Sequence, residues 1–358
     1  MRNRIVSLVA LFCCAALLVF SDACLDAARS ALAIWWNSVL PALLPFSVFL
    51  SLAESAGLPS VLRRLLPVSG SRWAALANAL TSFLFGAISG FPNGARIAAS
   101  AECSPLAAYC NLCSPIFLHS VICCGLLKSP NMFAPLYISH CLSALVLLLA
   151  STLTRQVRQA PADTADILRR DGIDLIGGIR DSIGVLGAVG GCMVVFSVLL
   201  TILCEANVFR FTAVLFSGIG IEEDVLRAAA HGLLEFSGGC AAIASLSLPL
   251  RIKAVLISLT ISFGGFCVLL QSRIFLPASA MRVYLLRKAL HALLSGLLCY
   301  TLFPAFLKTD MPALNIPNGA RYIDNSLTGL GLLFASAIPL AAVYLAGLCL
   351  KKRLAAHM

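Results

Sequence analysis

Polar and helix-breaking residues interrupt the apolar runs of this chain at a few places, and these residues are the best suited to bind a solute. Ser89-Gly90-Phe91-Pro92-Asn93-Gly94 is the first such stretch, and Asn111 with Ser114 marks a second one shortly after it. In the other half, Glu235-Phe236-Ser237-Gly238 forms a third, and Gln271 follows a glycine pair. A helix continues poorly through proline and glycine, and a helix broken at membrane depth presents unpaired N–H and C=O groups to a cavity. We therefore expect a solute-binding site formed by Ser89, Gly90, Asn93, Gly94, Asn111, Ser114, Glu235, Ser237, Gly238 and Gln271.

Each of these stretches also has a simpler explanation. A kink at the membrane face needs no ligand, and small polar side chains such as Asn111 and Ser114 commonly pack between membrane helices. Glu235 is the sharpest candidate, because an acid inside an apolar segment is costly and commonly faces a cavity, a proton path or a cation. In that case Glu235 would also couple solute movement to an ion. The alternative is an interfacial residue at a helix end.

The sequence gives little support to other kinds of chemistry. Single histidines on apolar helices can shuttle protons but are more often packed residues, and this applies to His119, His140, His231 and His291. Cys110-x-x-Cys113 lacks a second pair of ligands, so we predict no bound metal and no cofactor. Gly-x-Ser-x-Gly, His-Glu-x-x-His and P-loop motifs are absent from the sequence, so we do not expect an enzyme.

The composition is that of an integral membrane protein. Hydrophobic residues make up 60% of the chain, charged residues only 12%, and the mean hydropathy is +0.95. Such a composition lies far outside that of soluble domains. The formal net charge of +10 comes from lysines and arginines placed singly or in small groups between apolar runs, as in cytoplasmic anchors. No basic stripe accompanies the charge, so we do not expect nucleic-acid binding.

The basic loops determine the expected topology. By the positive-inside rule the loop that contains Arg63 and Arg72, the polar stretch 155–181 and the terminal 351–353 are cytoplasmic. The spans expected between them are 73–90, 104–127 and 131–152, then 182–204, 228–248, 254–272, 283–307 and 327–350. An odd number of spans cannot join two loops on one side, so one segment of each set must be broken or re-entrant. We choose the segments with Ser89-Gly90 and with Ser237-Gly238.

The two chosen segments indicate an internal repeat. Each is followed by small residues and, at nearly the same spacing, by a helix that begins with a tyrosine, Tyr137 or Tyr284. We predict an all-α integral membrane protein of about eight spans plus two broken or re-entrant helices, arranged as an inverted repeat. The expected segments are 1–72 (two helices, the first an uncleaved span rather than a signal peptide), 73–152 (first repeat), 153–181 (cytoplasmic linker), 182–225 (connecting helix), 226–307 (second repeat) and 308–358 (last loop and helix).

Several runs of the sequence resemble a known family. They are LPALLPFSVF at 40–49, SGFPNGARIA at 89–98, the Asn-x-x-Ser-Pro-Ile-Phe run at 111–117 and GLLEFSGGCAAI at 232–243. Together they resemble the YlbJ-type sporulation integral membrane proteins, whose halves are similar to the nucleoside-recognition or Gate domain. The resemblance implies a bacterial cell-membrane protein that is required for spore formation. It leaves the substrate open, because relatives with Gate domains include nucleoside and ferrous-iron transporters.

Two functions follow as expectations. The first is a transporter that moves a small polar solute, a nucleoside being one option, between the two repeats. The second is a non-transporting sporulation factor that uses the same fold to assemble partners in the membrane. The expected partners are the lipid bilayer, the solute, and either further copies of the chain or other sporulation membrane proteins.

Overall fold

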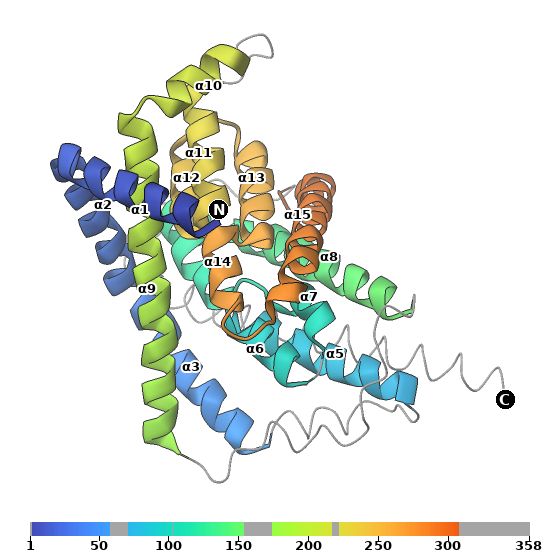
Figure 1. Ribbon diagram of the computed structural model, residues 1–358. Helices are drawn as coiled ribbons and strands as arrows, with labels where there is room; N and C mark the ends of the chain where they lie inside the picture. Colours follow the sequence, from blue (N-terminus) through green and yellow to red (C-terminus); the bar gives the residue numbers. More distant parts are fainter. Residues whose placement is uncertain (1, 58–70, 102, 154–173, 217–221, 308–358) are drawn as a thin grey trace, which may run out of the picture.

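The computed structural model describes residues 2–57, 71–101, 103–153, 174–216 and 222–307, and within these ranges the chain forms helices and no strands (Figure 1). The elements are α1 (Arg2–Val19), α2 (Ser21–Ile34), the π-helical η1 (Trp35–Val39), α3 (Leu40–Ser55), α5 (Ser71–Ser89), α6 (Asn93–Ser100), the 3-10 turn η2 (Ser104–Leu106), α7 (Ala107–Cys110), the π-helical η3 (Phe117–Leu126), the 3-10 turn η4 (Pro130–Met132), α8 (Phe133–Leu153), α9 (Leu175–Glu205), α10 (Val208–Phe216), α11 (Glu223–Leu234), α12 (Phe236–Ser245), α13 (Leu250–Phe263), α14 (Gly265–Ser272) and α15 (Ala278–Leu307).

Two helix breaks lie in the first half, where the sequence predicts them. Helix α5 ends at Ser89, and Gly90 has a left-handed backbone with φ +77°, which residues with a Cβ rarely adopt. Pro92 then stands directly before α6. Helix α7 ends at Cys110, and residues 111–114 form an extended link to the helical turn that continues into η3.

The second half contains a corresponding pair of breaks. Glu235 is extended, with φ −144° and ψ 120°, and separates α11 from α12. Gly264 and Gly265 have φ angles of +82° and +74° and separate α13 from α14. In each half, therefore, two broken helices are followed by one long helix, α8 or α15. These two long helices pack against each other, and α13 lies along α15.

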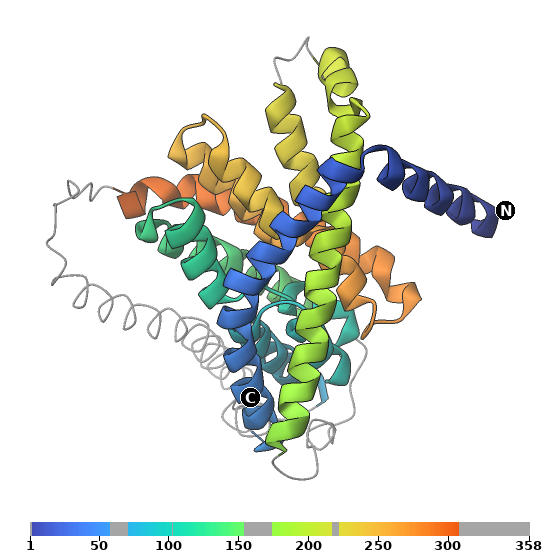
Figure 2. The ribbon, with the colours of Figure 1, turned by 90° about the vertical axis from the view of Figure 1, so that its left-hand side faces the viewer.

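A long column of helices stands beside this broken-helix core. Figure 2 shows α2, η1 and α3 running as one column beside α9. Helices α2 and α3 both pack closely against α9. The Trp35 indole donates a hydrogen bond to the carbonyl of Leu186 (2.9 Å) and lies over Gly190, where a Cβ would come within 2.7 Å of the ring. Helix α1 bends away from this column by 101° and projects from the body of the molecule.

Helix α9 begins earlier than the sequence suggested. We expected a polar linker up to residue 181, but residues 175–181 form the first turns of α9. Asp174 caps this helix, because its side chain accepts a hydrogen bond from the Gly177 amide (2.8 Å). The cap at Asp174 stabilises the first turns of α9, which include the charged residues Arg180 and Asp181.

Four helical segments are long and apolar enough to cross a membrane: Pro130–Thr152, Leu175–Glu205, Leu250–Ser272 and Ala278–Ala305. The bent pair Ala10–Val19 and Ser21–Val39 would make a fifth. The expected span 73–90 corresponds to α5, which ends at the first break and contains the apolar helix Leu76–Ser89. The expected span 104–127 is interrupted at residues 111–114, which leaves the shorter apolar helix Phe117–Leu126. The expected span 327–350 lies outside the described residues. The described part of the chain is therefore an all-helical membrane protein with four or five candidate spans.

Candidate functional site

The two breaks of the first half are packed directly against each other. A Cβ on Gly86 or Gly94 would overlap the carbonyl group of Cys110, and one on Gly90 would come within 2.6 Å of the Ser114 side chain. These three positions therefore tolerate only glycine. The predicted binding residues Gly90 and Gly94 serve close backbone packing in this structure, which leaves little room for a ligand between the two breaks.

Asn111 joins the two halves of the molecule. Its Nδ2 donates to Ser272 Oγ (3.0 Å) and to the Tyr284 hydroxyl (2.8 Å), and its Oδ1 accepts from the Ala95 amide (3.3 Å). Its backbone carbonyl accepts from Lys288 Nζ (3.0 Å). Asn111 is fully buried. Both amide protons are thus used within the protein, and the residue holds α6, the extended link, α14 and α15 together.

Glu235 caps the helix that follows it. One carboxylate oxygen accepts from the amide and the hydroxyl of Ser237 (2.8 and 2.7 Å), and the other accepts from the Gly238 amide (2.7 Å). The side chain is only 2% exposed, and it forms no ion pair with any described residue. The carboxylate is balanced by the N–H groups at the start of α12, where a helix favours negative charge.

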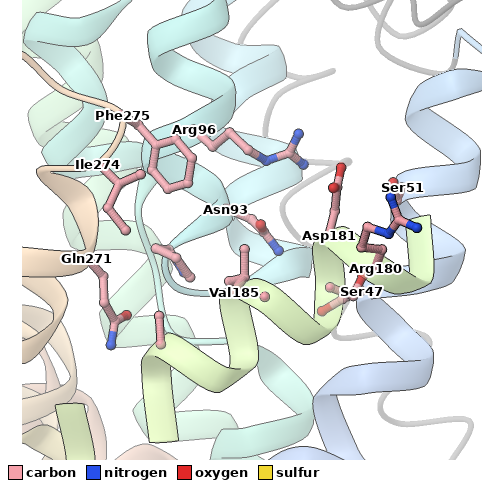
Figure 3. A pocket seen from close by; sticks show the side chains of 14 residues that line it. Ser47, Ser51, Asn93, Arg96, Arg180, Asp181, Val185, Gln271, Ile274 and Phe275 are labelled. Atoms are coloured by element: carbon pink, nitrogen blue, oxygen red, sulfur yellow. The ribbon is translucent and has the colours of Figure 1, made fainter. Parts of the chain in front are cut away.

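Three cavities follow the column of η1 and α3 through the protein. The first, of about 430 Å³, lies between α3, α9, α6 and the end of α14 (Figure 3). The second holds only about 30 Å³ and is lined by residues from all four breaks or their immediate neighbours, among them Phe91, Ser114 and Glu235. The third, of about 580 Å³, lies between η1, η3 and α12. Gln271 lines the first and second cavities, and Ser237 lines the second and third, so the three are consecutive.

Three aromatic rings line the narrow middle cavity. Phe236 packs edge-on against Phe91 and at a tilt against Phe117, with ring centroids 5.3 Å apart in both pairs. All three rings line the middle cavity, together with apolar side chains of the column such as Leu43 and of α9 such as Met193. We call Phe91, Phe117 and Phe236 the aromatic plug. It separates two wider cavities by a space of about one water molecule.

Two buried amide side chains keep unused hydrogen-bonding groups beside the plug. Asn93 is 8% exposed and its side chain makes no hydrogen bond with any described residue. The Asn93 amide points from α6 into the first cavity (Figure 3). Gln271 is 4% exposed, and its Nε2 donates a hydrogen bond to the weak acceptor Cys267 Sγ (3.1 Å). Buried amides normally use their donors and acceptors, so these two are suited to bind a polar ligand.

Charged residues lie at the opposite end of the first cavity from Gln271. Arg96 from α6 and the neighbouring Arg180 and Asp181 from α9 line it, and Figure 3 shows Arg96 and Asp181 pointing toward each other. Ser47 and Ser51 of α3 complete this wall. The third cavity is lined by uncharged groups, including Asn37, Ser38 and Ser120. The two outer cavities therefore differ in charge.

The remaining predicted residues have distinct positions. Ser114 lines the middle cavity, where its Oγ accepts from the Phe117 amide (3.2 Å). Ser237 lines two cavities while it is bonded to Glu235. Ser89 is buried with its hydroxyl unpaired and lines none of the three cavities. Gly238 lies under the His231 ring, which a Cβ would overlap. The structure thus brings Asn93, Ser114, Glu235, Ser237 and Gln271 to the cavities.

Sequence reasoning missed the aromatic plug and Lys288. Lys288 is 1% exposed, and its Nζ lies 5.2 Å from the centre of the Phe91 ring. A lysine inside an apolar run is itself a signal of a functional position, and this signal was present in the sequence. The plug gave no such signal, because phenylalanines in apolar helices are common.

The histidines of α8 and α15 form more than single packing contacts. His140 accepts from the Cys113 amide through Nε2 (3.0 Å), and its Nδ1 lies 2.7 Å from Ser262 Oγ. His291 bonds through Nε2 to the His140 carbonyl (2.9 Å), and the two rings are 5.0 Å apart. In the described part of the chain, no group of three or more histidine, cysteine or acidic residues is arranged to hold a metal ion.

Comparison with known proteins places the chain near one curated relative. No protein-family model matches it, and no solved structure is significantly similar to it. The chain is 24% identical over 304 residues to the sporulation integral membrane protein YlbJ of Bacillus subtilis, and the match covers 73% of this chain and 72% of that protein. With its apolar helices, the chain is thus a membrane protein similar to a protein named for sporulation.

Proposed function

We propose that this protein moves a small polar solute across a bacterial cell membrane, along the path formed by the three cavities. The observation that carries the proposal is the row of cavities that share Gln271 and Ser237 and run past all four helix breaks. Broken helices around a polar midplane are a recurring design of secondary transporters. A purely structural protein would have no need for two wide cavities joined through a narrow one.

The order of elements supports an inverted repeat around this path. Each half has two broken helices and then a long helix, and the long helices α8 and α15 cross each other. We propose that the two halves are inverted copies in a protein of about eight spans, so that each outer cavity opens to a different side of the membrane.

The chemistry of the path suits a solute with several hydrogen-bonding groups, such as a nucleoside. Asn93 and Gln271 offer amide donors and acceptors beside the plug, and Ser114 and Ser237 offer hydroxyls. The rings of the plug offer an apolar surface for the flat part of such a solute. Movement of Phe91 or Phe236 would join the middle cavity to one outer cavity at a time.

The relative's name supports spore formation as the process that needs this transport. The competing function is a non-transporting factor that assembles other sporulation proteins in the membrane. The two differ in one measurable respect, because only a transporter exchanges solute through the protein.

The first test is solute exchange in proteoliposomes with labelled uridine, succinate and choline, which are neutral, anionic and cationic probes. We expect saturable exchange of at least one probe, and roughly tenfold faster leak with Phe236→Ala, because truncation removes the ring that touches both other plug residues. Phe263→Ala is the matched control, since Phe263 lines none of the three cavities. No exchange of any probe, together with equal leak in both variants, would favour the assembly factor.

A second test locates the openings of the path. Single cysteines at Ser51 and Ser120 line the first and third cavities and are partly or fully exposed. A membrane-impermeant thiol reagent should label them from opposite sides. Gly94 and Gly239 are unsuitable positions, because a Cβ there would overlap the backbone of Cys110 or Gly232. Labelling of both serine positions from one side contradicts a path through the membrane.

A further inference from the structure

Three basic side chains are buried together where α8 and α15 cross. His140 and His291 are fully buried and Lys288 is 1% exposed. We call these three residues the basic cluster. The titratable groups of the surrounding elements are the thiols of Cys113, Cys141 and Cys299 and the hydroxyls of Tyr137 and Tyr284, and none of them is a carboxylate. A buried basic cluster with no carboxylate among the described residues around it is unusual, because any positive charge in it would lack a counter-charge.

The hydrogen bonds define which nitrogens carry protons. A backbone amide only donates, so His140 Nε2, which accepts from Cys113, carries no proton. A carbonyl only accepts, so His291 Nε2, which faces the His140 carbonyl, carries one. His291 Nδ1 is buried and has no hydrogen-bond partner of ordinary geometry among the described residues. His140 is therefore neutral in this structure, and its Nε2 is able to take up a proton only when the Cys113 amide moves away.

We infer that the basic cluster is a proton-binding site, and that proton uptake at His140 releases the extended link 111–114. A proton on Nε2 turns an acceptor into a donor, so the Cys113 amide loses its partner. The proton arrives as hydronium through water in the middle cavity, which Cys113 lines, and it adds to the electron pair of Nε2 once the Cys113 amide has released that pair. The link must move toward the cavity for this to happen, which couples proton uptake to the shape of the path.

Lys288 strengthens this coupling. Its ammonium holds the other end of the same link through the Asn111 carbonyl. When His140 and Lys288 both carry a proton, their like charges repel each other in a region of low dielectric. Both hydrogen bonds that fix the link from α8 and α15 are therefore weakened by a single proton. Proton-driven transport would rest on the proposed function, whereas the proton site and its effect on the link do not.

The test is hydrogen–deuterium exchange of the purified full-length protein at pH 7.5 and pH 5.5, with each rate divided by the intrinsic exchange rate at that pH. We expect the corrected exchange of residues 111–117 to rise about fivefold or more at pH 5.5, the factor given by loss of one ordinary hydrogen bond. Exchange within α13 should not change. A flat profile of residues 111–117 in the unaltered protein overturns the inference without any variant.

Two histidine variants sharpen the result. His140→Gln takes up no proton in this range, so its corrected exchange should not depend on pH. His119→Gln is the matched control, because His119 is buried in η3 against Phe133 and makes no hydrogen bond to the link. An equal rise in His140→Gln and in the unaltered protein overturns the proton site.

The exchange experiment and the flux experiment fail separately. A rise in exchange of residues 111–117 with no flux of uridine, succinate or choline supports the proton site and contradicts transport. Flux that an imposed pH gradient does not change, together with flat exchange, supports transport and contradicts the proton site. Flux that a pH gradient drives in the unaltered protein and in His119→Gln, but not in His140→Gln, supports both.

Discussion

The two pairs of helix breaks are built alike but are held differently. In the first half, the link 111–114 is fixed by side chains from distant elements, namely Tyr284, Lys288 and His140. In the second half, Glu235 satisfies its own helix end, and Gly239 packs on the backbone of Gly232. The break at Glu235 is thus capped locally, whereas the link 111–114 depends on contacts across the molecule. We expect the first pair to be the part that responds to its surroundings.

The largest expected effect comes from filling the close backbone contacts, which both pairs share. Gly94→Ala and Gly239→Ala should each destabilise the protein by about 3 kcal/mol, because the new methyl group overlaps backbone that cannot move aside. Gly187→Ala in α9 is the control, since nothing lies within 4 Å of its Cβ position. The measurement is thermal unfolding in detergent. A small effect at 94 and a large one at 239 would mean that the first pair adjusts by backbone movement.

The second largest effect is expected from removing the side chain that caps α12, and it is compared with removing the cap of α9. Glu235→Ala removes three hydrogen bonds from the buried end of α12 and should cost about 2 kcal/mol. Asp174→Ala removes the corresponding exposed cap of α9 and should cost about 1 kcal/mol or less. Unfolding in denaturant measures both. Equal losses would show that burial of the Glu235 carboxylate cancels the benefit of its hydrogen bonds.

The smallest effect tests the contact across the two halves. Tyr284→Phe removes a buried hydroxyl that bonds to Asn111 and Ser272, and should cost about 1.5 kcal/mol. Tyr137→Phe removes one longer bond, to the Ala87 carbonyl at 3.3 Å, and should cost about 0.5 kcal/mol. Thermal unfolding of both variants checks the order. A larger loss of stability in Tyr137→Phe than in Tyr284→Phe would contradict the conclusion that residues of the second half fix the first pair of breaks.

Much of the site followed from local sequence. Three of the breaks were expected at Gly90-Phe91-Pro92, Ser114-Pro115 and Glu235, and the structure confirms breaks at all three places. The candidates Asn93 and Gln271 do line a cavity with unused amide groups. Asn111 looked equally suitable in the sequence, yet its amide is consumed by Ser272 and Tyr284. The sequence offered no way to tell these amides apart, because the difference lies in partners far along the chain.

The sequence by itself determined that this is a helical membrane protein and where its helices break. Both properties are local: apolar runs are long enough to enter a bilayer, and proline and glycine weaken a helix where they stand. They do not always end it, because α3 and α15 continue through Pro45 and Pro304. Only the tertiary structure decided which polar groups face a cavity, which rings close it and which bases meet at the crossing of α8 and α15. These properties depend on residues that are more than one hundred positions apart, such as His140 and His291, and no local pattern of residues encodes such a distance.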